Sequence, residues 1–314
     1  MIRGLYTSAS GMLALQNRQE SLANNLANVN TPGFKQDLGV MRAFPEQLIS
    51  RIRDQEGPDI QGYPNLSGQA AVIGRLNSGV YMSEAMPMFT QGDIAETRNP
   101  YDVALMDNLQ PDQDGNERRL FYSVARLEDL TQPAQPEDIR YTRNGNWSVN
   151  SDGYLVTADG YYVLDAQNQA VRVNNPDDLL NGVSVGQGLI ISKTGDLQYE
   201  DPTTKELVSL PNNQRLGLSV ITDPMKLVRE GTNIFRFEGD IPVESLDVAE
   251  ANDPLIAGRY GTQQGWIERA NVDPMQTITS MMSALRAYEA NQRVITTIDG
   301  TLEKAANEIG RVNG

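Results

Sequence analysis

The feature of this sequence that most restricts its fold is a long run of heptad spacing near the C-terminus. Ten positions follow one another at intervals of three and four residues, and eight of them are apolar or aromatic. They are Ile278, Met281, Leu285, Tyr288, Gln292, Ile295, Asp299, Leu302, Ala306 and Ile309. Such spacing is typical of a coiled-coil seam. With Asp273 as N-cap and Pro274 at the first helical position, we predict a helix over about 274–310, roughly 55 Å long.

The N-terminal stretch shows the same spacing in weaker form over residues 2–28. Its seam positions are Leu5, Ala9, Met12, Gln16, Gln19, Ala23 and Leu26. Beside them runs a stripe of small residues, Gly4, Ser8 and Gly11, which would let another backbone approach closely. Each glycine lowers helix stability by about 0.8–1 kcal/mol relative to Ala. We therefore expect a helix that is marginal alone, stable mainly when packed, and ended by Pro32.

Between about residues 76 and 260 the chain changes to short β-branched or aromatic runs separated by turn residues. Asp152-Gly153 and Asp159-Gly160 each stand between two such runs, which predicts β-hairpins. The connector before this region contains several glycine and proline breaks and, over about 44–53, one possible short helix. We predict an α+β fold with a helix over 1–30, an extended connector over 31–75, a mainly-β domain over 76–262 and a helix over 263–314.

Charge is distributed unevenly along the 314 residues. The chain has 26 Lys and Arg against 41 Asp and Glu, a formal charge of -15, which makes nucleic acid a poor partner. Residues 1–53 hold six basic and three acidic side chains, and residues 266–314 hold five basic and six acidic ones, so the centre carries -17. Nearly neutral ends can pack against other protein without a large electrostatic penalty.

Composition also limits the possible chemistry. The chain has no His and no Cys, which excludes His-dependent nucleophilic sites, Cys or His metal sites and disulfides. Residues 112–117 begin like a calcium loop but lack the Gly at position 6 and the bidentate Glu at position 12 of such a loop. Asp152, Asp159 and Asp165 could supply paired carboxylates, yet all three lie in or beside predicted turns. We expect no enzyme activity, no cofactor and no metal, and the sequence has no run of apolar residues long enough to span a bilayer.

Periodicity alone leaves two interpretations of the terminal helices open. They could pair within one chain and close the domain. They could instead pack between chains, which would suit a subunit that polymerises through its ends.

Several motifs resemble those of the flagellar axial proteins, the rod and hook subunits of the basal body. The N-terminal motif is Ser8 to Met12 followed by Leu22 to Lys35 (LANNLANVNTPGFK). Further matching stretches follow in family order: Asn99 to Leu105, Tyr141 to Gly145 with Asp152 to Leu155, and Gly265 to Val272 with Arg286 to Asn291. The segment Met41 to Ile52 looks most like a distal rod-type protein of Gram-positive bacteria.

The resemblance implies a non-enzymatic structural subunit that is exported through the flagellar type III apparatus and assembles helically in the rod between basal body and hook. It implies an extracytoplasmic location in the basal body and partners among copies of itself, other rod and hook subunits and the export apparatus. It also implies termini that are largely unfolded before assembly and then pair as an inner coiled-coil layer, with the β domain outside. Deferring the ordering of the termini until they dock fits their marginal helices.

We assign subunit-interface packing to positions in both helices. They are Leu5, Ala9, Met12, Leu22, Asn24, Asn25, Leu26, Asn28, Ile278, Met281, Leu285, Arg286, Tyr288, Glu289, Asn291, Ile295 and Leu302. For the asparagines the alternative is an exposed helix end rich in cap-forming residues.

The chain departs from the family pattern after its Asn99 motif. We interpret residues 106–140 as an acidic insertion that forms an outward loop. Two other functions stay open at this point: a secreted carbohydrate-binding or carbohydrate-active β protein with a helical clasp, and an assembly scaffold or cap.

Overall fold

The computed structural model describes residues 2–51, 71–112, 115–173, 189–200, 207–210, 214–239, 243–253, 256 and 258–309. The chain divides into two compact units. The first combines Met1–Asn24, Asp37–Met86 and Met275–Gly314, and the second combines Asn25–Gln36 with Pro87–Pro274. Terminal helices and a mainly-β centre confirm the predicted α+β class. The segment boundaries predicted at residues 30, 75 and 262 stay predictions.

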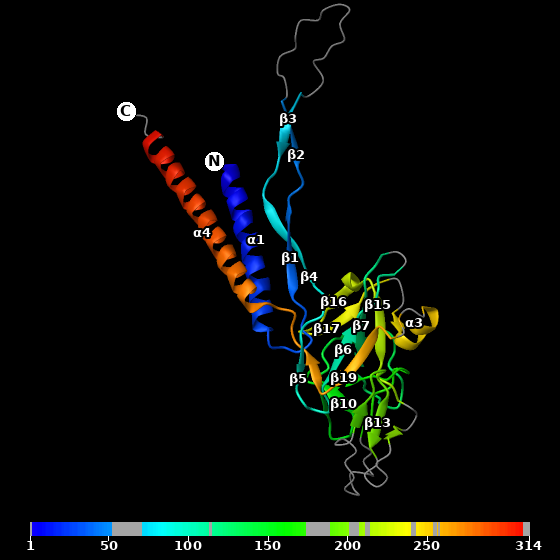
Figure 1. Ribbon diagram of the computed structural model, residues 1–314. Helices are drawn as coiled ribbons and strands as arrows, with labels where there is room; N and C mark the ends of the chain where they lie inside the picture. Colours follow the sequence, from blue (N-terminus) through cyan, green and yellow to red (C-terminus); the bar gives the residue numbers. More distant parts are fainter. Residues whose placement is uncertain are drawn as a thin grey trace, which may run out of the picture. The chain divides into compact units, whose positions relative to one another are not determined.

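Both long helices belong mainly to the first unit. α1 spans Ile2–Ala27, and α4 spans Pro274–Lys304 before a π-helical turn, η5, at Ala305–Ile309. α4 begins at the expected proline, whose fixed φ suits the first helical turn. The two helices lie side by side (Figure 1), and a Cβ built on Gly4 would lie 3.4 Å from Ile298 Cδ1. The small-residue stripe of α1 is therefore the face that approaches α4.

A two-stranded arm completes the first unit. β1 (Asp37–Ala43) pairs with β4 (Val80–Pro87), and β2 (Gln47–Arg51) pairs antiparallel with β3 (Ala71–Leu76). The short helix predicted over 44–53 is therefore wrong. A five-residue segment with only Leu48 and Ile49 apolar fits a helix and a strand equally well, and pairing with β3 decides in favour of the strand.

The second unit is built on a sheet that has nine strands among the residues described. Its main path is β16 (Leu227–Arg229), β17 (Ile234–Phe237), β8 (Ile139–Thr142), β7 (Arg118–Ala125), β11 (Tyr162–Val163), β10 (Leu155–Thr157) and β9 (Trp147–Val149). β15 (Leu218–Thr222) pairs with β7 and with β18 (Glu244–Ser245), which is followed by α3 (Leu246–Asn252). A 3₁₀ turn, η4, occupies Pro224–Lys226.

Smaller sheets flank this main sheet in the same unit. β12 (Leu189–Ile191), β13 (Leu197–Glu200) and β14 (Leu207–Ser209) form one of them. β19 (Tyr260–Gln264) pairs with β6 (Val103–Asp107), and β20 (Trp266–Glu268) pairs with β5 (Ile94–Glu96). We call the sheets of the second unit the β body, and the two strands that precede α4, β19 and β20, are part of it.

The predicted Asp-Gly turns are confirmed. Gly153 joins β9 to β10 and Gly160 joins β10 to β11, and both have positive φ angles, 83° and 79°, which glycine adopts without strain. Asn150 Oδ1 accepts hydrogen bonds from the backbone N–H groups of Asp152 and Tyr154. The Asn150 side chain therefore stabilises the turn that contains Asp152 and Gly153.

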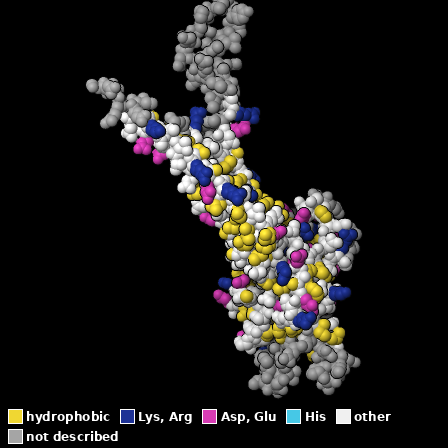
Figure 2. Space-filling model, turned by 60° about the vertical axis from the view of Figure 1, so that its left-hand side comes forward, with side chains coloured by type: hydrophobic (Ala, Val, Ile, Leu, Met, Phe, Trp, Pro, Cys, Tyr) yellow, Lys and Arg dark blue, Asp and Glu magenta, His cyan; other side chains and the backbone are white. Residues whose placement is uncertain are grey.

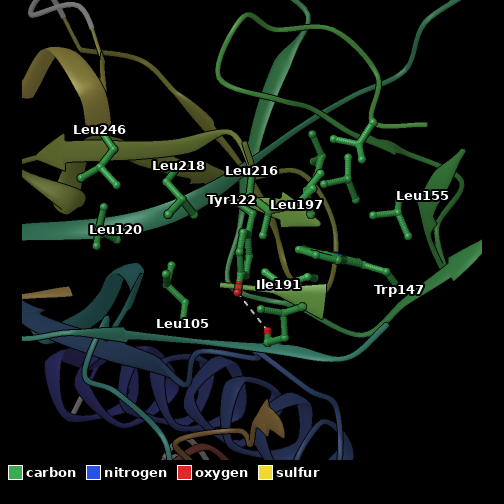
Figure 3. Packing of buried hydrophobic residues seen from close by; sticks show 14 of the residues in the cluster. Leu105, Leu120, Tyr122, Trp147, Leu155, Ile191, Leu197, Leu216, Leu218 and Leu246 are labelled. Atoms are coloured by element: carbon green, nitrogen blue, oxygen red, sulfur yellow. Dashed lines mark hydrogen bonds between the residues drawn. The ribbon is translucent and has the colours of Figure 1, made fainter. Parts of the chain in front are cut away.

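The apolar core lies around β7, which is buried along nearly its whole length. Tyr122 on β7 packs edge-on against Trp147 at 4.8 Å between ring centroids and donates a hydrogen bond to Val103 O at 2.9 Å (Figure 3). A second cluster contains Phe89, Phe121 and Phe235. β7 lies within residues 106–140, so the outward loop predicted there is wrong. The segment departs from the family pattern but supplies a central strand.

Candidate functional site

Four charged side chains are buried together in the second unit, and we call them the junction cluster. Lys35 follows the turn after α1, Asp107 ends β6, Arg143 follows β8, and Glu268 ends β20. Each side chain is at most 3 % exposed. Segments far apart in the sequence thus meet at one point inside the β body.

Glu268 is the centre of the junction cluster. Its Oε1 lies 2.6 Å from Lys35 Nζ and accepts a hydrogen bond from the Gly92 N–H at 2.8 Å. Its Oε2 accepts from Arg143 Nε at 2.9 Å. Arg143 Nη1 also donates to Asp107 Oδ2 at 2.8 Å. Two cations therefore face two carboxylates, as buried charges require.

Burial and charge pull the pKa values of this cluster in different directions. Burial lowers the pKa of Lys35 to about 8, although the Glu268 carboxylate opposes this effect. Burial alone would raise the pKa of Glu268, but the Arg143 guanidinium and the Lys35 ammonium outweigh it and hold that pKa below its usual value. The two pKa directions differ because Glu268 has two cationic neighbours, whereas Lys35 has one adjacent carboxylate and a repelling guanidinium. The cluster strongly favours an ionised Glu268.

The segment 33–36 is also held through its backbone. The Gly33 N–H donates to Glu268 O at 2.8 Å. Gly33 has φ of 68°, and a Cβ there would lie 2.5 Å from Asn144 N, so only glycine fits. Arg229 Nη2 donates to Lys35 O at 2.6 Å, and its guanidinium lies 4.8 Å from the ring centre of Phe34.

The segment that precedes α4 is fixed by a similar set of contacts. Asn271 Oδ1 accepts from the Gln36 N–H at 2.7 Å, and Asn271 Nδ2 donates to Met88 O at 2.8 Å. The Arg269 N–H donates to Asp93 O at 2.8 Å. Residues 33–36, which follow α1, and residues 268–271, which precede α4, are thus held together on the β body.

The predicted interface positions of α1 are covered to different extents. Leu5, Ala9, Met12, Leu22, Leu26 and Asn28 are half-buried, Asn24 is exposed, and Asn25 is buried. The most covered face instead contains small residues: Ser8, Gly11 and Ala14 are all buried. A Cβ on Gly11 would lie 3.0 Å from Asn291 Nδ2 of α4. Close approach of the helices thus depends on the small stripe more than on the seam.

On α4 the covered face shares only every second position with the predicted seam. Met281, Tyr288, Asn291, Ile295 and Leu302 are half-buried, while Thr277 and Ala284 are buried. Ile278 and Leu285 remain 42 % and 43 % exposed, and Arg286 and Glu289 are exposed as well. α4 therefore has one face toward α1 and a second, apolar face toward solvent. Which of these residues lie between copies stays a prediction.

The described part of the chain can also be searched for metal sites, for membrane-spanning helices and for the carboxylates that the sequence singled out. No group of three or more His, Cys, Asp or Glu side chains there could hold a metal ion, and none of its helices is long and apolar enough to cross a membrane. Residues 113 and 114 of the calcium-like loop lie outside the residues that the structure describes. Asp165 Oδ1 accepts from the N–H groups of Gln167 and Gln169, which is a turn-forming role.

Sequence reasoning missed the junction cluster as a site. Lys35, Arg143 and Glu268 all belong to motifs that were recognised, but none was assigned a role. The available signal was a charged residue at the end of an otherwise apolar or aromatic run, as in Trp266-Ile267-Glu268. Asp107 carries a similar signal, because it follows the apolar strand Val103–Met106.

Three family models match the chain. They are the flagella basal body rod protein model at residues 5–35, the flagellar hook protein FlgE/F/G D1 domain at 131–199, and the flagellar basal body rod FlgEFG protein C-terminal model at 263–308. Lys35, Arg143 and Glu268 each lie in a different one of these segments. The junction cluster therefore connects all three.

Curated relatives match along nearly the whole chain. The chain is 34% identical to the flagellar hook-basal body complex protein FlhO of Bacillus subtilis, over 99% of this chain and 100% of that protein. It is 30% identical to the flagellar basal-body rod protein FlgG of Borreliella burgdorferi, over 98% of both chains. It is 29% identical to FlgG of Agrobacterium fabrum, over 95% of this chain and 96% of that one.

Proposed function

The chain belongs to the family of flagellar basal-body rod proteins, and from this we propose that it is a distal rod-type subunit that polymerises helically through α1 and α4. Membership makes it a structural component of the flagellar basal body. The family favours this function over a carbohydrate-active protein or an assembly cap. In the proposed rod, the polymer couples the motor to the hook and the protein performs no catalysis.

The observation that carries the proposal is the junction cluster. Lys35 lies on the segment that leads from α1 into the β body, Glu268 lies on the segment that leads from the β body into α4, and Arg143 belongs to the β body itself. We call the first two segments the crossings. A buried ion pair is weak evidence for net stability, but it strongly disfavours arrangements that leave one charge alone. We infer that the cluster holds the same residues of the two crossings against each other in every copy. In each copy, α1 then ends and α4 begins at the same two places on the β body.

The helices complete this proposal. The helices meet through the small-residue stripe of α1, and part of the α4 seam is exposed, so each helix is thinly covered within one chain and packing against neighbouring copies supplies most of its stability. Partners in this scheme are further copies and other rod or hook subunits, and the inner layer of the polymer is a coiled coil of α1 and α4. Export through the flagellar type III apparatus is part of the same proposal.

A seam substitution tests the proposed assembly. Ile295 is a half-buried seam position of α4, and Thr297 is an exposed residue two positions along. In a flagellated strain whose own gene is replaced by this one, Ile295→Asp should remove the protein from isolated basal bodies and abolish swimming. The matched Thr297→Asp variant should assemble normally. A swimming Ile295→Asp strain with the usual amount of protein in its basal bodies would contradict the proposal.

A further inference from the structure

One surface of the first unit combines α1 with the β arm. Ser10 Oγ accepts a hydrogen bond from the Val80 N–H at 3.4 Å, and a Cβ on Gly79 would lie only 2.1 Å from Ser10 Oγ. Gly79 has φ of 134°, so both its backbone shape and this close approach require glycine. The arm is thereby seated on α1 at Ser10.

Large apolar side chains surround this contact and remain exposed. Tyr6 and Leu13 lie one helical turn to either side of Ser10 and are 66 % and 64 % exposed. From the arm, the rings of Phe44 and Tyr81 pack at 5.1 Å between centroids, and a Cβ on Gly79 would meet Phe44 Cδ2 at 3.7 Å. We call Tyr6, Leu13, Phe44, Val80 and Tyr81 the aromatic patch.

The same unit carries a second exposed apolar surface on α4. Met275, Ile278, Met282 and Leu285 follow 3-4-3 spacing and are each at least 42 % exposed, and we call them the α4 stripe. Hydrophobic side chains gather over this early part of α4 in Figure 2. By helical geometry the stripe lies on the side of α4 away from Thr277 and Ala284, which are buried. Both surfaces are therefore exposed among the residues that the structure describes.

We propose that the aromatic patch of one copy receives the α4 stripe of a second copy. This inference rests on the proposed function and adds two points to it: the β arm is part of the contact, and the contacting face of α4 is the 275/278/282/285 face. Methionine side chains adapt to irregular surfaces and pack favourably against aromatic rings. Aromatic residues are also those most often found at the centre of protein interfaces.

Charge favours a second copy as the occupant. α1 contains two Arg and one Glu, and α4 contains three basic and three acidic residues, so both helices are nearly neutral. The centre of the chain is strongly acidic, and two such centres repel each other. Copies can therefore approach through the helices at the smallest electrostatic penalty.

The geometry of the contact fits an open polymer. Patch and stripe are different surfaces of one chain, so their contact can repeat head to tail, and when the rotation between copies does not close a ring this repetition generates a helical filament. The stripe is about 15 Å long, from its ten-residue span. One such contact is small, and the polymer repeats it along its length.

The absence of cysteine from the natural chain allows a direct test. Two full-length single-cysteine variants, Leu13→Cys and Met282→Cys, are expressed together in a strain that lacks its own copy. Because each protein carries one thiol, a Leu13→Cys to Met282→Cys disulfide can form only between copies. Isolated basal bodies are oxidised with copper phenanthroline and analysed by non-reducing electrophoresis.

A matched pair provides the control. Arg18→Cys on α1 and Val294→Cys on α4 are also at exposed positions, Val294 being 45 % exposed, but they lie five residues from Leu13 and twelve residues from Met282, on other faces of the two helices. We expect at least fivefold more heterodimer from the first pair than from the control pair. Adding Tyr81→Ala to the Leu13→Cys protein should reduce that yield.

The outcomes separate this inference from the function on which it rests. Equal yields from the two pairs, or no cross-link in basal bodies that contain the protein, overturn the patch and stripe contact while the rod function stands. Absence of both proteins from the basal bodies of every strain, including the control, overturns the rod function and the contact together.

Discussion

The two units differ in what holds them together. The second has an apolar core around β7, with Leu120 and Tyr122 fully buried, and a junction cluster whose charges are compensated inside one chain. The first has two long helices that meet through small residues and leave Leu13 and Leu285 largely exposed. The β body therefore has a buried apolar core of its own, whereas the helices leave large apolar side chains exposed.

Amide hydrogen exchange should show the largest difference between the units. In a dilute monomer we expect amides of α1 and α4 to exchange near the rate of an unfolded chain, and amides of β7 to exchange only on global unfolding. This corresponds to a gap of about 5 kcal/mol or more in opening free energy. Mass spectrometry of peptides from full-length protein measures it. Strong protection of both helices would break the comparison and favour an intramolecular clasp.

Removing the central charge of the junction cluster should have the next largest effect. Glu268→Gln leaves Lys35 and Arg143 facing each other with one carboxylate fewer, and loss of one partner from a buried pair destabilises by about 3–5 kcal/mol. Urea unfolding followed by tryptophan fluorescence measures the loss in the second unit.

The control for this substitution is Glu96→Gln on the neighbouring strand. Glu96 is paired with Arg98 at 3.2 Å but is 49 % exposed, so its removal should change stability by at most about 0.5 kcal/mol. If Glu268→Gln unfolds at the same urea concentration as Glu96→Gln, the cluster does not hold the crossings.

A pair of leucine truncations sharpens the contrast. Leu120→Ala opens a cavity in the core and should lower the free energy of unfolding by about 2–5 kcal/mol. Leu285→Ala, at a position 43 % exposed, should change monomer stability by about 0.5 kcal/mol or less and yet reduce incorporation into basal bodies. Equal losses of stability would mean that α4 is already packed in the monomer.

The smallest expected effect is a pH dependence from Lys35. Its folded pKa of about 8 lies below the unfolded value of 10.5, so between these values the unfolded chain binds more protons and stability rises with pH. Lys35→Arg keeps its charge throughout this range. The stability of the wild type relative to Lys35→Arg should therefore increase by about 1 kcal/mol between pH 7 and pH 9 in denaturant titrations. A difference that is constant with pH would show that Lys35 does not titrate there.

Local signals made part of this structure predictable. The proline at the start of α4, the helical periodicity of its sequence and the Asp-Gly turns each act over a few residues, and α4 and the two turns are found where the sequence indicated. The short segment at residues 47–51 is ambiguous because its partner strand begins twenty residues after it ends. A departure from the family pattern over residues 106–140 predicts an insertion and gives no indication of the central strand β7.

The junction cluster required information that no local pattern contains. A charge at the end of an apolar run can face solvent or a partner, and the partner of Lys35 is 233 residues further along the chain. Periodicity likewise identified α4 but could not distinguish the face toward α1 from the exposed one, since Ile278 and Thr277 are adjacent. Burial of charges and choice of helix face both depend on tertiary structure.

The close approach at Gly33 has a mechanical consequence. The Gly33 backbone lies against Asn144, and the nearby Lys35 is paired with Glu268. Residues 33–36 therefore cannot extend or shift when a force is applied to them. Twisting force that arrives along the chain at residues 33–36 is passed to the sheet through short, directional bonds. A segment held in this way is expected to deform little under torque.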